Sequence, residues 1–198
     1  RFAPLLEPLP RPRLAVLLGG GNRYYRFTAA RAAALGEALA ALARREGAGL
    51  ALTPSRRTPP EALAALLGPL QGLPHWCWEG EGENPYFGLL AWADAILVTE
   101  DSVCMVCEAC ATGRPVYVLG LEGRGRKFED FHRRLRQAGH TRPFRGALEP
   151  GWRGRALDDM GRLARALGPR VVAHLEGHGA ARPGTYAEAG APARHGRP

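Results

Sequence analysis

Short apolar runs alternate with alanine- and leucine-rich segments along most of this chain, and this alternation constrains its fold more than any other feature. The first run, residues 14–18, is continuously apolar and stops at three glycines, residues 19–21. Such a run is typical of a strand that is buried on both faces, and the glycines favour a tight turn after it. Residues 28–45 then predict a helix, because alanine and leucine dominate and Thr28 can cap its start.

The same unit recurs further along the chain. Strands are expected at 49–53, 75–78, 95–99 and 116–119, and helices at 60–67, 85–92, 102–112 and 128–137. Strands that alternate with helices in this way pair in parallel through right-handed crossovers. The sequence therefore predicts an α/β fold, a Rossmann-like, doubly wound parallel sheet.

The two ends of the chain lack this alternation. The proline-rich residues 1–12 predict a linker, and residues 13–172 a Rossmann-like domain that ends in an amphipathic helix at 157–167, packed back on it. Residues 173–198 are rich in Gly, Ala, Pro and Arg without periodicity and predict a disordered tail. No apolar stretch reaches the roughly 20 residues that span a bilayer. A cytoplasmic location is expected, with peripheral association at a membrane surface left open.

Charge and cysteine usage narrow the classes of function. The net charge of +8 comes almost wholly from arginine. A solvated basic face explains it most simply, although such charge also suits phosphate-bearing ligands or anionic membranes. No recognition-helix motif, zinc-finger spacing or basic strip interleaved with aromatics is present, so nucleic acid is not expected as a partner. Cys104, Cys107 and Cys110 would fan out around a helix, which favours small buried thiols over a metal site.

The turn after the first strand has the composition of an anion site. It reads G-G-G-N-R-Y-Y-R-F, in which the backbone amides of Gly20 and Gly21 can approach a phosphate, with Asn22 in the same loop and Arg23 as a charge partner. A tyrosine stands where the dinucleotide fingerprint needs its third glycine, and no P-loop lysine motif occurs. NAD-dependent chemistry and ATP hydrolysis of the usual kind are therefore disfavoured.

Two further loops are expected at the same edge of the sheet. Ser55, Arg56 and Arg57 follow the second strand, where a guanidinium could bind a phosphate in a bidentate manner, although a plain surface turn explains them equally well. Asp101 and Ser102 begin the helix after the fourth strand. Ligands of open α/β sheets bind outside the carboxyl ends of the strands, so these loops define one candidate site.

Glu108 stands about two turns into that helix, among small and apolar neighbours. An acid in such a setting needs a partner. The residues alone allow two explanations, a salt bridge to an arginine or hydrogen bonds accepted from the hydroxyl groups of a ribose.

Residues 84–117, N-P-Y-F-G-L-L-A-W-A-D-A-I-L-V-T-E-D-S-V-C-M-V-C-E-A-C-A-T-G-R-P-V-Y, strongly resemble the signature of the Elongated Mitochondria fission family. The S-R-R-T-P turn at 55–59, the glycine loop and F-H-R-R-L-R-Q-A-G-H-T-R-P-F at 131–144 support the resemblance. It implies a GT-B-like fold of two Rossmann-like domains, with this chain as the carboxyl-terminal, donor-side half. The amino-terminal, acceptor-side domain would be a missing partner.

The same segment is similar to the donor-binding segment of the peptidoglycan N-acetylglucosaminyltransferases. There the matching glutamate binds the nucleotide ribose, which implies that role for Glu108, with Met105 in the same ligand-binding segment and the diphosphate near Gly20, Gly21 and Ser102. The implied ligand is a nucleotide-sugar, expected to be a UDP-sugar, with no cofactor or metal, since no Asp-x-Asp motif is present. Catalytic residues stay unassigned.

A non-catalytic role is the alternative to a glycosyltransferase. Plant members of the resembled family act in mitochondrial fission as adaptors, so this chain could keep the fold and use its surface for recruiting a partner or docking on a membrane. In that case Trp76 and Trp78, expected to be exposed, and the basic groups would matter more than Glu108.

Overall fold

The strand β1 (Arg13–Leu18) lies at the centre of a six-stranded sheet, and its residues from Leu14 onward are all buried. We describe residues 1–178 of a computed structural model, and these residues divide into two units after residue 157. In the first unit the sheet order is β4-β3-β1-β5-β6-β8, and all neighbouring strands are parallel. The other strands are β3 (Gly49–Pro54), β4 (His75–Cys77), β5 (Ala95–Thr99), β6 (Val116–Leu119) and β8 (Arg142–Pro143).

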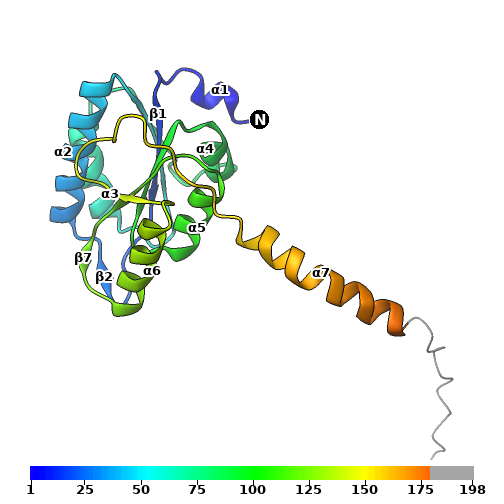
Figure 1. Cartoon of the computed structure of the whole chain (residues 1–198). Coiled ribbons are helices and arrows are strands. Elements are labelled where there is room, and N and C mark those ends of the chain that lie inside the picture. The colour runs from blue at the N-terminus through cyan, green and yellow to red at the C-terminus, as the bar shows by residue number, and fades with distance from the viewer. Residues whose placement is uncertain (179–198) are drawn as a thin grey trace, which may run out of the picture. The chain divides into compact units, whose positions relative to one another are not determined.

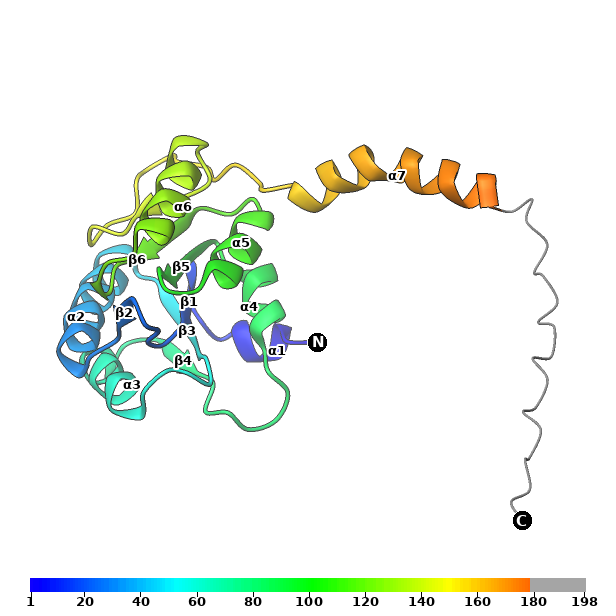
Figure 2. The same cartoon turned by 90° about the horizontal axis from the view of Figure 1, so that it is seen from below.

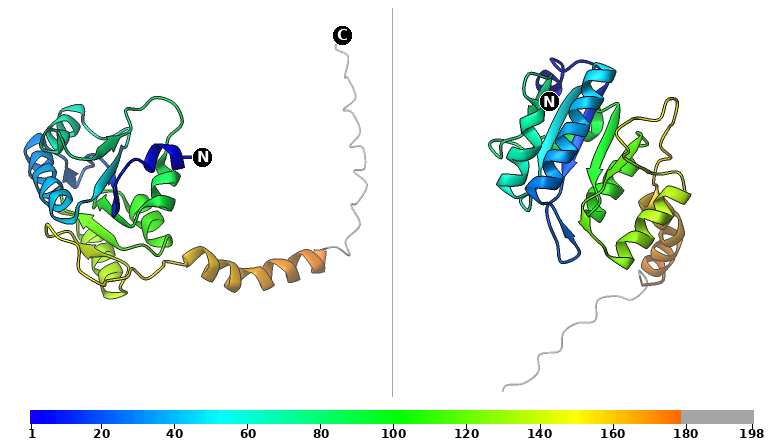
Figure 3. Two further views of the ribbon diagram at one scale, coloured as in Figure 1. Left: turned by 90° about the horizontal axis from the view of Figure 1, so that it is seen from above. Right: turned by 90° about the vertical axis from the view of Figure 1, so that its left-hand side faces the viewer.

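Two layers of helices cover the sheet. On one face lie α2 (Ala29–Glu46) and α3 (Pro60–Leu67), and on the other α4 (Tyr86–Trp92) and α5 (Val103–Ala111) (Figure 2 and Figure 3). Because side chains alternate along a strand, Leu14, Val16 and Leu18 pack in the core beneath α2 and α3, while Ala15 and Leu17 pack beneath α4 and α5. The continuous apolar run of β1 therefore serves two cores at once.

The chain reverses its direction of winding between β1 and β5. Numbered by the order of its main strands, the sheet has the arrangement 3-2-1-4-5-6 of the dinucleotide-binding folds. The predicted Rossmann-like, doubly wound sheet is confirmed, with the five expected strands in place. Loops that leave β1, β3 and β5 at their carboxyl ends are neighbours at this switch point.

The helices begin and end close to their expected positions. At α2, the Oγ1 of Thr28 accepts a hydrogen bond from the amide of Arg31 at 3.1 Å, which confirms the predicted cap. Gly47 ends the helix with a φ of 63°, a conformation that favours glycine. The remaining helices of this unit are α1 (Ala3–Leu6), a 3₁₀ turn at Gly68–Leu70 and α6 (Arg126–Gln137).

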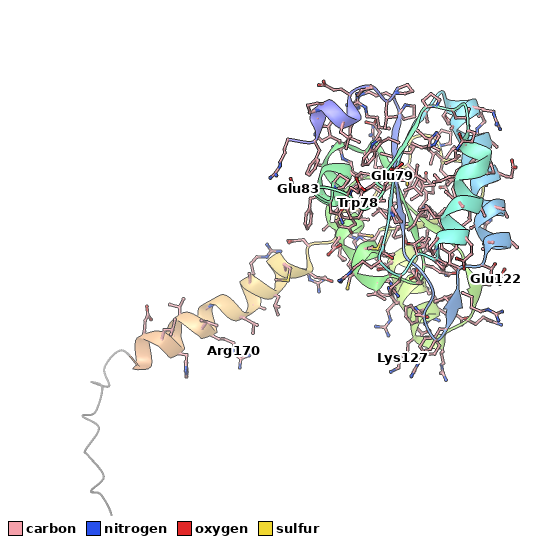
Figure 4. The ribbon with its side chains drawn as sticks, turned by 180° about the vertical axis from the view of Figure 1, so that it is seen from behind. Trp78, Glu79, Glu83, Glu122, Lys127 and Arg170 are labelled. Carbon is pink, nitrogen blue, oxygen red and sulfur yellow. The ribbon has the colours of Figure 1, made fainter. Side chains whose placement is uncertain are left out.

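Several short elements of the first unit were not expected from the sequence. The strand β8 extends the sheet beyond β6, and β2 (Tyr25–Arg26) pairs with β7 (Glu122–Gly123) in a small antiparallel ribbon (Figure 1). Glu122 on β7 and Lys127 at the start of α6 lie at the end of the domain where this ribbon projects (Figure 4). Residues 1–12, expected as a linker, include α1, and Leu6 and Leu9 are buried in the core beneath α4.

The second unit contains the helix α7 (Asp159–His178). It begins two residues later than expected and continues past Pro169, so residues 173–178 of the expected tail are helical. The rest of that tail, residues 179–198, lies outside the described residues. Large apolar side chains, Met160, Leu163 and Leu167 among them, are exposed on α7. No helix in the described part of the chain is long and apolar enough to cross a membrane.

Candidate functional site

The carboxylate of Asp101 is the central group at the carboxyl edge of the sheet. Its side chain is completely buried, between the end of β5 and the start of α5. Oδ2 accepts a hydrogen bond from the amide of Gly20 at 3.1 Å and another from Nη2 of Arg57 at 3.2 Å. Oδ1 is also buried and has no hydrogen-bond partner among the described residues. A buried carboxylate is stable only with such partners, so Asp101 ties the loops after β1 and β3 to α5.

Arg57 forms the other half of this connection. Nη1 of its guanidinium donates to the carbonyl oxygen of Gly21 at 3.3 Å, while Nη2 donates to Asp101. The side chain is 48% exposed, in contrast to the buried acid that it contacts. From the sequence, Arg56 was the candidate ligand-binding arginine of this turn, and Arg57 was named only as its neighbour. The structure shows that Arg57 reaches both neighbouring loops, whereas Arg56 is exposed on the surface turn.

The glycines after β1 are required by close packing. A Cβ atom on Gly19 would lie 2.3 Å from Oδ1 of Asp101, and one on Gly20 would lie 1.9 Å from the carbonyl oxygen of Arg57. The amide of Gly19 donates to Oγ1 of Thr99 at 2.7 Å, and Gly20 is itself buried. In this conformation the amide of Gly20 is therefore engaged inside the protein, while Gly21 is only half-buried.

Asn22 organises the rest of the glycine loop. Its Oδ1 accepts from the amides of Tyr24 and Tyr25, at 2.8 and 3.0 Å, and its Nδ2 donates to the carbonyl oxygen of Asp101 at 3.3 Å. This is the local hydrogen bonding by which asparagine stabilises turns. Arg23 is exposed and its guanidinium lies over the ring of Tyr24 at 4.5 Å from the centroid.

Ser55 lies in a tight turn after β3. Its amide donates to Oγ1 of Thr58 at 2.9 Å, and its Oγ accepts from the amide of Arg57 at 3.2 Å. The hydroxyl of Thr58 in turn donates to the carbonyl oxygens at the end of β1. The S-R-R-T turn is thus fastened to the glycine loop, and it presents its arginines at the edge of the sheet.

Ser102 and Met105 lie on the first part of α5. Ser102 is the N-cap residue, although its hydroxyl makes no capping hydrogen bond. Met105 is half-buried and packs against the core beneath α4 and α5. The amides of the first turn of a helix favour anions.

Glu108 forms a second group, on the exposed face of α5. Its Oε2 accepts a hydrogen bond from the hydroxyl of Tyr86 on α4 at 2.5 Å. Burial of the phenol and this hydrogen bond raise the pKa of Tyr86, so it stays a donor across the physiological range. A groove of about 510 Å³ beside them is lined by Glu108, Phe87, Leu90, Ala91, Ala111, Thr112 and Arg114. Neither expected partner of Glu108, an arginine or a ribose, is needed to explain its orientation.

A buried histidine contacts the backbone just after β5. His132 on α6 is 3% exposed, and its Nε2 lies 2.8 Å from the carbonyl oxygen of Glu100. Because a carbonyl oxygen can only accept, Nε2 donates this hydrogen bond, and burial lowers the pKa of His132. Glu100 accepts from the amide of Leu121 through Oε1, and burial raises the pKa of its carboxyl group.

The cysteines of α5 differ in burial. Cys104 is exposed, whereas Cys110 is buried and its Sγ lies 3.8 Å from the carbonyl oxygen of His140. Burial raises the pKa of the Cys110 thiol to about 12. In the described range 1–178, no three His, Cys, Asp or Glu side chains are grouped to hold a metal ion. The tryptophans expected to be exposed, Trp76 and Trp78, are half-buried.

Comparisons with known proteins add a family and a fold. The sequence profile of the family described as "Mitochondrial fission ELM1" matches residues 1–171. The "Mitochondrial fission protein ELM1" of Arabidopsis thaliana is 33% identical over 168 residues, which are 83% of this chain and 39% of that protein. The chain therefore spans well under half the length of this relative.

Among solved structures, a putative UDP-N-acetylglucosamine 2-epimerase from Listeria monocytogenes aligns with a TM-score of 0.51 and 18% identity, over 86% of this chain and 40% of its own. The UDP-GlcNAc 2-epimerase of Neisseria meningitidis bound to UDP-GlcNAc has a TM-score of 0.46 and 14% identity, over 88% and 41% of the two chains. The likeness to the Listeria protein shows the fold alone, a Rossmann-like domain of the GT-B type.

Proposed function

We propose that this chain, which belongs to the mitochondrial fission ELM1 family, is a nucleotide-sugar-binding domain that takes a UDP-sugar or a similar donor at the carboxyl edge of its sheet. The observation that carries the proposal is the carboxylate of Glu108, which is exposed on α5 and oriented by the hydroxyl of Tyr86. An ionised carboxylate offers about four acceptor positions, enough for Tyr86 and both hydroxyls of a ribose.

The helix that carries Glu108 also begins at the switch point of the sheet. A ribose held at Glu108 would direct the diphosphate of a nucleotide toward the first turn of α5 at Ser102, where amides and the arginines of the edge favour anions. The Listeria monocytogenes protein is described as a putative UDP-N-acetylglucosamine 2-epimerase, and the same ligand class is proposed for this chain.

The proposal concerns binding by this chain. The chain covers only 39% of the Arabidopsis relative. An acceptor-side domain and sugar transfer are therefore proposed only for a protein of that relative's length. The family description links the chain to mitochondrial fission, and on that ground we propose a cytoplasmic location with peripheral contact at a membrane surface.

Calorimetric titration with UDP, UDP-GlcNAc and uridine tests the proposal. Saturable binding is expected, and Glu108→Gln should weaken the binding of all three at least about tenfold, since hydrogen bonds to a charged group contribute about 1.5–3 kcal/mol. The matched control is Glu61→Gln, which changes an exposed glutamate on α3, on the other face of the sheet, and should bind as the wild type does. Absence of nucleotide binding, or equal binding by Glu108→Gln, would favour the adaptor role.

A further inference from the structure

The guanidinium of Arg57 is held in a fixed orientation while much of it stays accessible. Among the described residues it donates to two acceptors, the carbonyl oxygen of Gly21 and the carboxylate of Asp101. Arginine has five N–H donors in a planar fork, so three remain for a ligand. The side chain is 48% exposed and lies at the switch point of the sheet, where ligands of such folds bind.

The acid that holds Arg57 cannot itself reach a ligand. The Asp101 side chain is completely buried, and the amide of Gly20 shares its Oδ2 with Arg57. The negative charge of Asp101 is paired with the guanidinium of Arg57, so Asp101 acts through the orientation of that guanidinium. Partners of this kind lower the entropy that a long side chain loses when it binds a ligand.

We propose that Arg57 binds the diphosphate group of the ligand and that Asp101 is its positioning residue, without contact to the ligand. The identity of that ligand as a nucleotide rests on the proposed function, whereas the recognition of a diphosphate does not. Arg57 reaches the glycine loop, so the bound group lies between the loop after β1 and the start of α5. The planar fork matches two phosphate oxygens at once, which an ammonium group does not.

The test uses the 198-residue chain with inorganic pyrophosphate, UDP and uridine as separate probes in calorimetric titrations. Arg57→Gln and Arg57→Lys are each expected to weaken the binding of pyrophosphate and UDP at least about tenfold, because the fork as well as the charge is needed. Uridine, which has no phosphate, should bind both variants within about twofold of the wild type. The control Arg44→Gln changes an exposed arginine at the far end of α2 and should leave pyrophosphate binding unchanged.

The role of Asp101 is tested by a double-mutant cycle. Asp101→Asn should weaken pyrophosphate binding in the wild-type background but change it by less than about twofold in the Arg57→Gln background, because it acts only through Arg57. Additive losses would overturn the positioning role. Should Asp101→Asn fail to fold in a thermal melt, the two Arg57 variants decide the inference.

The outcomes separate this inference from the proposed function. Pyrophosphate binding that depends on Arg57, with no binding of UDP or uridine, would support the inference and contradict the nucleotide site. Wild-type protein that does not bind pyrophosphate, or Arg57→Gln that binds it as tightly as the wild type, would overturn the inference, whatever the result with uridine.

Discussion

Asp101 and Glu108 lie on the same short segment, one before α5 and the other within it, but their surroundings have little in common. Asp101 is completely buried and contacts the loops after β1 and β3, whereas Glu108 is exposed and accepts a hydrogen bond from Tyr86. A buried carboxylate contributes to stability through its partners, and an exposed one keeps acceptor positions for a ligand. The difference teaches that a cluster of polar residues at a sheet edge contains both supporting and binding groups.

The largest expected effect separates these two acids by stability. Asp101→Ala removes the acceptor of the buried Gly20 amide and of Arg57, and it should lower the free energy of unfolding by about 3 kcal/mol. Glu108→Ala should change it by no more than about 0.5 kcal/mol, as is usual for exposed positions. Urea unfolding of both variants measures the contrast. Equal losses of stability would show that Asp101 does not contribute more to the stability of the fold than Glu108 does.

The crowding around the glycine loop gives the next largest effect. Gly20→Ala would place its Cβ 1.9 Å from the carbonyl oxygen of Arg57, so the loop must shift, and a loss of about 2 kcal/mol is expected. Gly68→Ala is the control, because no atom lies within 4 Å of its Cβ position. That variant should be as stable as the wild type or slightly more stable in the same urea experiment. If Gly20→Ala is as stable as the wild type, the loops after β1 and β3 can move apart without loss of stability.

His132 is buried, like Asp101, and its titration should have the smallest effect on the free energy of unfolding. Burial depresses the pKa of this group below its ordinary value of 6.5. The hydrogen bond to the carbonyl oxygen of Glu100 acts against burial, Arg136 acts with it, and Asp101 acts against it. A depressed folded pKa gives stability that is present above the unfolded pKa and is lost as the pH falls through the folded pKa. The free energy of unfolding should therefore decrease between about pH 7.5 and 5.5.

His132→Gln keeps a donor for the carbonyl oxygen of Glu100 but does not titrate, so the variant should show a flatter pH profile over the same window. The raised pKa of the Glu100 carboxyl group has the opposite effect, because its contribution to stability increases as the pH falls toward the ordinary value of 4.5. An unchanged slope in His132→Gln would assign the pH dependence to other groups.

The sheet was predictable because its central strands are continuous apolar runs between turn signals, as in residues 14–18 and 95–99. Two-residue strands carry no such period, so Arg142–Pro143 and the β2–β7 ribbon were missed. The prolines of residues 1–12 concealed α1 and the burial of Leu6 and Leu9, because proline signals a linker as strongly as it signals the first turn of a helix.

The grouping of the candidate residues at one edge was predictable, but the role of each residue was not. Topology alone brings the loops after β1, β3 and β5 together, so Gly20, Ser55 and Asp101 were expected at one edge. Which of these groups is buried depends on packing between distant segments, and no local pattern distinguishes Arg57 from Arg56. The adjacent aromatic residues Tyr86 and Phe87 could have drawn attention to the partner of Glu108, but nothing in the sequence shows where the hydroxyl of Tyr86 points.

The tight fit of Gly20 against the backbone of Arg57 also limits how this surface can change over generations. Because a side chain at position 20 collides with the turn after β3, and that turn is tied to Asp101, the three segments cannot drift independently. Substitutions among them should show strong epistasis, so a relative with a different ligand would be expected to replace all three together. An engineer who wants a wider pocket at this edge would have to select these loops as one block.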